Sequence, residues 1–253
     1  MLWVRVKEHE RALWLKHGRL ASIRGAGRHW NWSWALSPGS TRVAVLDALR
    51  SRLPEEFVEA CTRQSAAGEH LHVVVLGESQ RALIWRDGKL AHALGPGRYA
   101  FWKNPASIEI ETFDVSTPRF THAKLDSILA NAEARSLLEV FNASETDATL
   151  LYQNSVMIER LTPGRHVFWK SGGVLAVRTI DLREQTVEVA GQEIMTGDKV
   201  TLRVTLLMSF RVSDPVRLLG DIAEFPTTLY REAQLALRGA GGSRTLDQLL
   251  ADK

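Results

Sequence analysis

Apolar and polar residues alternate along residues 200–212, VTLRVTLLMSFRV, in the C-terminal part of the chain. A period of two with many β-branched residues is typical of a strand that buries one face. Similar segments precede it at 175–189 and 192–195, and Gly197-Asp198 provides a turn before the last one. The pattern therefore predicts long strands over residues 175–212, with the last strand at 199–212.

Shorter strands are predicted around QRALIWRDGKLAHALGPGRYAFW, residues 80–102. The apolar run at 81–85 is strand-like, and Asp87-Gly88 is a strong signal for a hairpin turn. Residues 89–92 then return as a second strand, and 99–102 follow as a third. The pattern indicates a small β-rich module.

This stretch occurs three times. Glu10–Trp32 aligns with Gln80–Trp102 without a gap, and Thr149–Trp169 aligns with Ala82–Trp102, so that positions 12, 82 and 149 correspond. Each copy is followed by a short apolar segment that ends in an aspartate, and these aspartates are evenly spaced: Asp47, Asp114 and Asp181. Internal repeats indicate structural units in series, so we predict three similar modules that superpose.

A glycine–proline turn precedes the third strand of the second and third copies. Gly95, Pro96 and Gly97 fit a type II turn, because proline presets φ at the second position and glycine supplies positive φ at the third. Pro163 and Gly164 take the same places in the third copy. We interpret these residues as structural turns, since the stretch lacks the Lys-Ser/Thr ending and the following helix of a P-loop.

Helices are predicted between and after the copies. The first spans 54–64, with proline in its first turn and two glutamates at the positive end of its dipole. A second spans 123–138 with a break near Asn131, and a strand is expected to begin at 139–141. Asp214-Pro215 opens a helix that ends near Ile222. The last two are predicted at 227–238, interrupted by Gly239–Gly242, and from Thr245 to Lys253.

Composition places the chain among ordinary globular proteins, with 253 residues, 45% hydrophobic and 24% charged. The net charge of +3 is a mild excess that we take to be spread along the chain, so it does not indicate nucleic-acid binding. The single cysteine, Cys61, excludes an intramolecular disulfide and is expected to be a buried small hydrophobe. No run of about 18 apolar residues predicts a transmembrane helix, and the N-terminus lacks a secretory signal.

Candidate chemistry is sparse, and no catalytic residue, cofactor or metal site is predicted. His70 and His72 share one face of a strand, but a metal site would need a further ligand at suitable spacing. A solvated or packed pair of histidines is the favoured interpretation. For Asp47, Asp114 and Asp181 we favour turns at strand ends over paired carboxylates.

The tryptophans of the first copy are the strongest candidates for a functional role. Trp30, Trp32 and Trp34 alternate and so share one side of a strand. One interpretation is core packing, since Trp32 aligns with Trp102 and Trp169 of the other copies. The other is an anchor at a membrane surface, because indoles favour the headgroup level. Trp30, Trp34 and the nearby Arg28 are the candidates for such a contact.

Residues 181–219 and 229–253 resemble the SPFH domain of stomatin, prohibitin and flotillin proteins, and are most similar to bacterial slipins. The resemblance rests on the order of long strands in 181–219, then a helix, a break and the Thr-Leu-Asp-x-Leu-Leu start of another helix. It covers about residues 140–253 and implies an α+β fold. The fold class expected is therefore α+β: three serial β-rich modules with intervening helices, the last continuing into an SPFH-type domain. The predicted boundaries are 1–69, 70–140 and 141–253.

The resemblance also implies function. It suggests a non-enzymatic scaffold, peripheral at the cytoplasmic face of the membrane, that forms homo-oligomers and organises partner membrane proteins such as a membrane protease. Two departures are that repeat modules stand where stomatins carry a hydrophobic N-terminal segment, and that the family's long coiled coil is absent. We expect Leu246, Leu249 and Leu250 to begin an oligomerisation helix that continues in a longer protein. Residues 1–253 alone would then be a monomer or weak dimer. The alternative is a soluble repeat module that binds a peptide or ligand.

Overall fold

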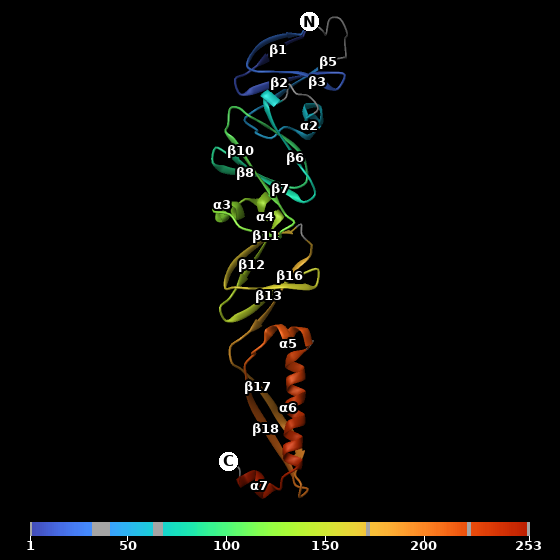
Figure 1. Cartoon of the computed structure of the whole chain (residues 1–253), viewed down its shortest axis with the longest axis vertical. Helices are drawn as coiled ribbons and strands as arrows, with labels where there is room; N and C mark the ends of the chain where they lie inside the picture. Colours follow the sequence, from blue (N-terminus) through green and yellow to red (C-terminus); the bar gives the residue numbers. More distant parts are fainter. Residues whose placement is uncertain (1, 32–40, 63–67, 171–172, 222–223, 252–253) are drawn as a thin grey trace. The chain divides into compact units, whose positions relative to one another are not determined.

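The computed structural model describes residues 2–31, 41–62, 68–170, 173–221 and 224–251. Over these residues the protein is a mixed α/β structure, rich in strands and with six helices (Figure 1). The chain divides into two compact units. The first unit comprises residues 1–140 and 167–173, and the second comprises 141–166 and 174–253. None of the described helices combines the length and the apolar character that a bilayer span requires.

The first unit begins with two small sheets. β1 (Leu2–Val6) pairs antiparallel with β4 (Gly27–Asn31), and the second sheet has the order β3-β2-β5. Its strands are β2 (Glu10–Lys16), β3 (Arg19–Arg24) and β5 (Thr41–Asp47). Val4 and Val6 of β1 pack against Ala12 and Trp14 of β2 and so join the two sheets.

The same arrangement of strands follows between Leu71 and Asp114. β6 (Leu71–Leu76) pairs with β9 (Gly97–Trp102), and a three-stranded sheet has the order β10-β7-β8. Its strands are β7 (Gln80–Arg86), β8 (Lys89–Leu94) and β10 (Ile108–Asp114). Asp87 and Gly88 form the predicted hairpin turn between β7 and β8, with φ of 49° and 77°. This geometry is that of the type I′ turn, which matches the twist of a hairpin.

The chain segments that leave one group of strands form hydrogen bonds with strands of the next group. After β5, Leu53 N–H donates to Ala100 O of β9 (2.8 Å), and Trp102 N–H donates to Ser51 O (2.9 Å). Trp102 is thereby buried among residues of the β2 sheet and of helix α2 (Glu55–Thr62), which include Leu13, Leu20, Phe57 and Cys61. The predicted helix at 54–64 is confirmed over Glu55–Thr62, and residues 63 and 64 lie outside the described residues.

A second junction of this kind follows β10. Trp169 N–H at the end of β15 (Gly164–Trp169) donates to Pro118 O (2.7 Å), beside the two-residue strand β11 (Arg119–Phe120). Trp169 is buried with Trp85 and Phe120, whose ring lies 4.7 Å from it at a steep angle. Helices α3 (Leu125–Ala130) and α4 (Ala132–Leu137) close this core.

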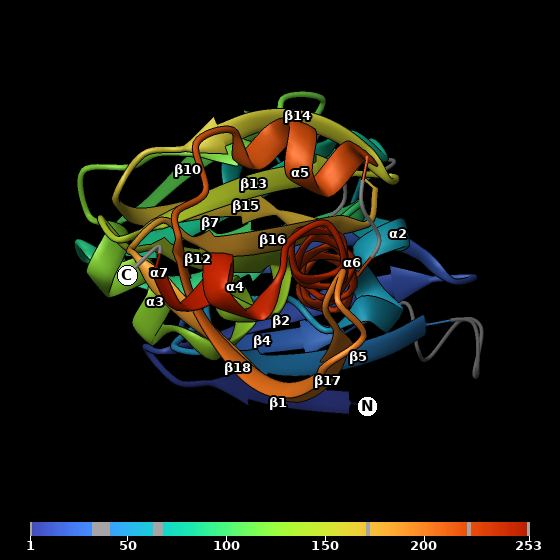
Figure 2. The same ribbon diagram turned by 90° about the horizontal axis from the view of Figure 1, so that it is seen from below.

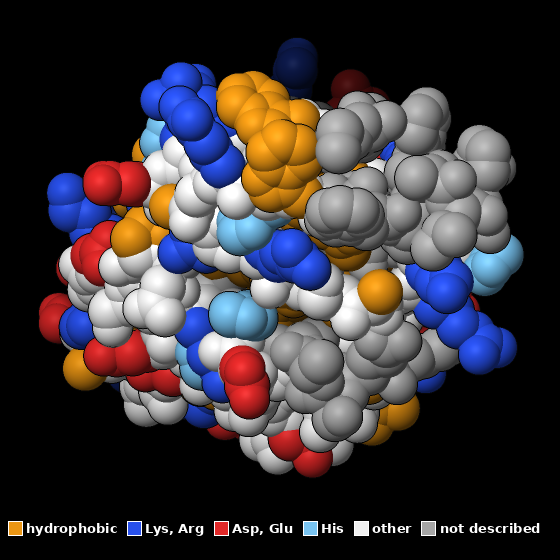
Figure 3. Space-filling model, turned by 90° about the horizontal axis from the view of Figure 1, so that it is seen from above, with side chains coloured by type: hydrophobic (Ala, Val, Ile, Leu, Met, Phe, Trp, Pro, Cys, Tyr) orange, Lys and Arg blue, Asp and Glu red, His pale blue; other side chains and the backbone are white. Residues whose placement is uncertain are grey.

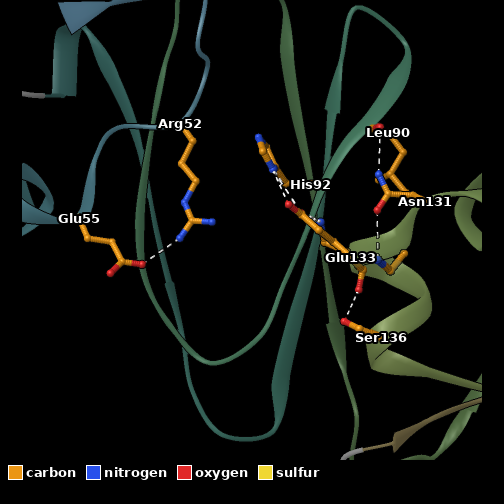
Figure 4. A network of polar contacts seen from close by, with 9 residues as sticks. Arg52, Glu55, Leu90, His92, Asn131, Glu133 and Ser136 are labelled. Atoms are coloured by element: carbon orange, nitrogen blue, oxygen red, sulfur yellow. Dashed lines mark hydrogen bonds and ion pairs between the residues drawn. The ribbon is translucent and has the colours of Figure 1, made fainter.

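The break predicted near Asn131 is confirmed, and it has a structural use. Asn131 is extended, and its side-chain oxygen accepts from Ala134 N–H (3.1 Å) to cap α4. Next to it, the Glu133 carboxylate accepts from Ala93 N–H of β8 (3.0 Å) and faces His92 Nδ1 (3.2 Å), as Figure 4 shows. The helix therefore satisfies backbone at an edge strand of the β7 sheet, a place that would otherwise be open.

The second unit contains a further three-stranded sheet and a long hairpin. The sheet has the order β14-β13-β16, formed by β13 (Asp147–Gln153), β14 (Val156–Leu161) and β16 (Leu175–Asp181). β12 (Leu138–Ala143) and β15 are each divided between the two units. The hairpin is β17 (Gln185–Met195) paired with β18 (Thr201–Phe210). Three helices follow: α5 (Pro215–Asp221), α6 (Phe225–Gly242) and α7 (Leu246–Ala251).

Helix α6 packs along β17 (Figures 1 and 2). Gln234 Nε2 donates to Gln192 Oε1 (3.0 Å), and Gly241 lies so close to the buried Ile194 that a Cβ there would be 2.5 Å from its Cδ1. The prediction of a helix ending at 238 is therefore wrong. Gly239–Gly242 are helical, because the small residue at 241 allows the helix to approach the strand.

The strands predicted at 175–189 are also corrected. This segment is not continuous, because β16 ends at Asp181 and β17 begins at Gln185. Asp181 Oδ1 accepts from Arg183 N–H (2.9 Å), and its carboxylate pairs with the Arg183 guanidinium (2.6 Å). These hydrogen bonds form a tight turn of the kind that aspartate side chains favour.

Candidate functional site

The first sheet pair places two tryptophans and two arginines on one face. In the β1–β4 register Trp3 lies opposite Trp30, and Arg5 lies opposite Arg28. Alternate residues of a strand point to the same side, so these four side chains share a face, called here the outer face. Trp3 is 50% and Trp30 is 52% exposed. Arginines and solvent-exposed indoles side by side form a basic, aromatic surface.

Alternation along β1 fixes this orientation. Val4 and Val6 point the other way, toward Ala12 and Trp14 of β2. On β4, His29 also points inward, where its Nε2 contacts Gly25 O (2.9 Å) and its ring lies 5.8 Å from the Trp14 ring. The inner positions are thus occupied by packed residues, and the tryptophans between them are left on the surface.

The electrostatics of this region are positive. Arg28 Cζ lies 5.7 Å from the centre of the Trp3 ring, within cation–π range. Residues 1–50 contain nine Lys and Arg against three Asp and Glu, a net charge of +6, while the remaining residues carry −3. The basic excess is therefore concentrated at the N-terminal end, which corrects the expectation that it is spread along the chain. Figure 3 shows hydrophobic and basic side chains next to each other on this surface.

The sequence-based candidates for membrane contact are only partly covered by this description. Trp30 and Arg28 lie on the outer face. Trp34, like Trp32, lies outside the described residues. Trp3 and Arg5 were not among the candidates, although the alternation LWVRV at residues 2–6 places them on one side of a strand. The strand pairing brings them opposite Trp30 and Arg28.

The glycine–proline residues lie where the strands turn. Gly95 and Pro96 join β8 to β9, and Gly97 and Gly164 are the first residues of β9 and β15, with Pro163 just before the latter. The φ angles of Gly97 and Gly164 are 145° and 131°. Both are positive, but they lie well above the roughly 80° of a type II turn. The type II assignment is therefore corrected to a more extended glycine conformation at the start of each strand.

Helix α7 carries the candidate oligomerisation residues. Leu246 and Leu249 are half-buried, Leu250 is 62% exposed, and no described residue of the helix is fully buried. The helix begins against the β17–β18 turn, where the Asp198 carboxylate accepts from Leu246 N–H (3.2 Å). Thr245 N–H donates to Gln248 Oε1 (3.0 Å), as in a capping box.

The residues that could support catalysis or metal binding lie in structural surroundings. The carboxylates of Asp47, Asp114 and Asp181 each accept from the N–H of the next residue but one, which confirms that they are turn residues at strand ends. Burial and the nearby Lys103 lower the pKa of His72, and burial raises the pKa of the Cys61 thiol to about 11. Within the described ranges, no group of three or more His, Cys, Asp or Glu is arranged to hold a metal ion.

Two hollows of the second unit are large enough to be considered as binding sites. One of about 480 Å³ lies between the end of β18, α5 and the start of α6, and includes Phe210, Arg217 and Phe225. The other, of about 670 Å³, lies between the β13 sheet and α5, and includes Tyr152, Arg178 and Leu219. Their volumes are in the range of ligand pockets, but the described residues that line them include no nucleophile paired with a base.

Comparison with known proteins identifies one family. The family described as SPFH domain / Band 7 family matches residues 74–253. The match starts within β6, well before residue 140, where the resemblance read from the sequence begins. It therefore includes the β7 sheet as well as the second unit.

Individual relatives match shorter stretches. Stomatin-3 of Caenorhabditis elegans is 34% identical over 76 residues, which is 30% of this chain and 28% of that protein. A stomatin homolog of Pyrococcus horikoshii is 35% identical over 74 residues, which is 29% and 28% of the two chains. Mechanosensory protein 2 of C. elegans is 30% identical over 108 residues, which is 40% and 22%. The chain thus spans less than a third of the length of these curated relatives.

Proposed function

The chain belongs to the SPFH domain / Band 7 family, and from this premise we propose that it is a non-enzymatic scaffold of the stomatin type, associated with a membrane. The observation that carries the proposal is the family match over residues 74–253, supported by relatives named stomatin. Within the family we place the chain nearest the slipins. Its site of action in this proposal is the cytoplasmic face of the membrane, where it is held peripherally.

The partners we propose are further copies of the chain and integral membrane proteins, for example a membrane protease. No catalytic residue or cofactor is assigned. In this scheme the protein acts by position, because an assembly at the bilayer surface holds its partners in one region.

We further propose that the chain contains three copies of one structural module, the last of which continues into the β17–β18 hairpin and helices of the SPFH domain. The strand registers support this. Ala12 pairs with Arg24, Ala82 with Leu94 and Thr149 with Leu161, which are the positions that the alignment of the three copies makes equivalent. Each of these pairings also has a bulge at the corresponding place.

Hydrogen bonds outside the sheets recur at equivalent positions. The bond from Trp102 N–H to Ser51 O corresponds to the bond from Trp169 N–H to Pro118 O, with donor and acceptor both at matching places in the next copy. Each of three equivalent side chains contacts the carbonyl oxygen of the residue four positions earlier in the sequence. The pairs are His29 with Gly25, Tyr99 with Gly95 and His166 with Thr162. Such details follow naturally from duplication of one folded unit, so the modules proposed are 1–69, 70–140 and 141–253.

Within this proposal self-association is assigned to α7. Leu246, Leu249 and Leu250 lie at i, i+3 and i+4, the spacing of an apolar stripe on a helix. A helix as short as the described part of α7 is marginal by itself. Pairing with the same helix of other subunits would bury the stripe, as in a coiled coil.

The proposal is tested by cell fractionation together with native mass. The natural protein, expressed in its own cell type, should sediment with membranes and be released by alkaline carbonate, and its purified form should be a large oligomer. A protein that stays in the supernatant as a monomer would contradict the scaffold and favour the second candidate, a soluble repeat module that binds a peptide or ligand.

A further inference from the structure

The outer face of the first sheet pair corresponds to a face that is used for docking at one position, Ala100, in the next module. In the gapless alignment of the first two copies, Trp3, Arg5, Arg28 and Trp30 correspond to Val73, Val75, Arg98 and Ala100. The inner residues obey the same alignment, because Val4, Val6, Ala12 and Trp14 correspond to the core residues Val74, Leu76, Ala82 and Ile84. The two faces can therefore be compared position by position.

In the second copy the chain that leaves the first copy covers this face at Ala100, while Val73 and Val75 remain 41% and 60% exposed. Ala100 is fully buried, its carbonyl accepts from Leu53 N–H (2.8 Å), and both residues belong to one core cluster. A small side chain at position 100 allows this close approach. Val167 takes the place in the third copy and is also buried.

The first copy has tryptophan where the others have alanine and valine. Trp30 is 52% exposed and lies beside Trp3, which replaces Val73. An indole at position 30 is too large for the docking seen at Ala100. At position 30 the tryptophan therefore replaces a residue that docks protein, and its indole remains exposed for another partner.

Resting on the proposed function, we propose that the outer face binds the surface of an anionic lipid bilayer. Indoles partition to the headgroup level, where their rings lie among the lipid carbonyl groups and their N–H groups remain hydrated. Arg5 and Arg28, opposite each other on the same face, can contact lipid phosphates with their guanidinium groups. The net charge of +6 within residues 1–50 complements a negative membrane surface.

Only a few groups are involved, so each module binds weakly. Attraction to an anionic surface is worth about fivefold in binding for each basic residue near it. Stable attachment then needs several copies held together, because linked sites raise the effective concentration. Membrane binding and assembly would thus reinforce each other.

The test uses vesicles that contain a fifth phosphatidylserine in phosphatidylcholine and measures the partition of residues 1–253 by co-sedimentation. Arg5→Gln with Arg28→Gln should lower the partition about 30-fold at low salt. Trp3→Thr with Trp30→Thr should lower it further and abolish the shift of tryptophan fluorescence to shorter wavelength on binding. Circular dichroism and the melting temperature should show that both variants fold.

Two matched controls isolate the face. Lys16→Gln with Arg19→Gln removes the same charge from the β2–β3 hairpin of the same copy, and Arg98→Gln changes the counterpart of Arg28. The hairpin variant should lose clearly less binding than the face variant, and Arg98→Gln should bind like the wild type. Equal loss in the hairpin variant would show that total charge, and not this face, determines binding.

The outcomes separate the two proposals. Absence of wild-type binding to any vesicle, at high lipid concentration, would contradict the membrane association on which this inference rests. Wild-type binding that survives both face variants would overturn the inference alone. A change in native mass without lipid, caused by Trp3→Thr with Trp30→Thr, would show that the face docks a second copy and would also overturn it.

Discussion

At the scale of single residues, position within the repeat decides what a side chain does. Trp102 and Trp169 are buried, with 2% exposure each, while Trp30, in the same strand of the first copy, is about half exposed. The sequence predicts an alternating aromatic strand and leaves both core packing and surface exposure open, because both faces of such a strand can be apolar. The neighbours Val4, Val6 and Trp14 decide between them, and that contact is known only from the fold.

The glycines at the strand starts provide a prediction at this scale. Gly97→Val and Gly164→Val should each lower the free energy of unfolding by about 1–3 kcal/mol, because their φ of 145° and 131° suits only glycine. Chemical denaturation measures the change. At Gly164 no atom lies within 4 Å of the added Cβ, so the loss there reports backbone strain alone, whereas at Gly97 the Tyr99 hydroxyl lies 3.1 Å away.

Gly95→Val is the matched control. Its φ is not in the positive region and no atom lies within 4 Å of its added Cβ, so a change clearly smaller than at Gly164 is expected. Equal losses at Gly95 and Gly164 would show that the positive φ does not matter.

At the scale of elements, local signals predicted most helices and strands correctly. The hairpin at Asp87-Gly88, helix α2 and the break at Asn131 each depend on a short-range preference of the residues themselves. The two errors have a shared cause. The continuation of α6 to Gly242 depends on a contact with Ile194 of β17, and the division of 175–189 depends on a side-chain turn at Asp181. Neither contact is visible in the periodicity of the segment.

Helix α6 therefore offers a comparison of two glycines. Gly239→Ala should raise the free energy of unfolding by up to about 1 kcal/mol, because alanine favours a helix and no atom lies within 4 Å of its Cβ. Gly241→Ala places a methyl group 2.5 Å from Ile194 Cδ1 and should lose that gain or destabilise the protein. Thermal unfolding monitored by circular dichroism distinguishes the two. A larger gain at 241 than at 239 would show that the helix does not approach β17 this closely.

At the scale of the whole molecule, the resemblance read from residues 181–253 led to the right family, although the match begins much earlier, at Val74. The sequence alone predicted Trp30 and Arg28 as candidates for membrane contact. It missed Trp3 and Arg5, because their pairing with a strand that is not their neighbour in sequence must be known before the four side chains can be placed on one face. It also missed the concentration of charge, since the net value of +3 hides opposite signs at +6 and −3.

In our proposal this family member binds a membrane, and its N-terminal end makes the contact. The most direct measurement is co-sedimentation of residues 1–253 with anionic and with zwitterionic vesicles over a range of salt concentrations. We expect binding to the anionic vesicles that weakens as salt rises, because exposed charges are screened, and much weaker binding to the zwitterionic ones. Equal binding to both, or no binding to either at high lipid concentration, would contradict it.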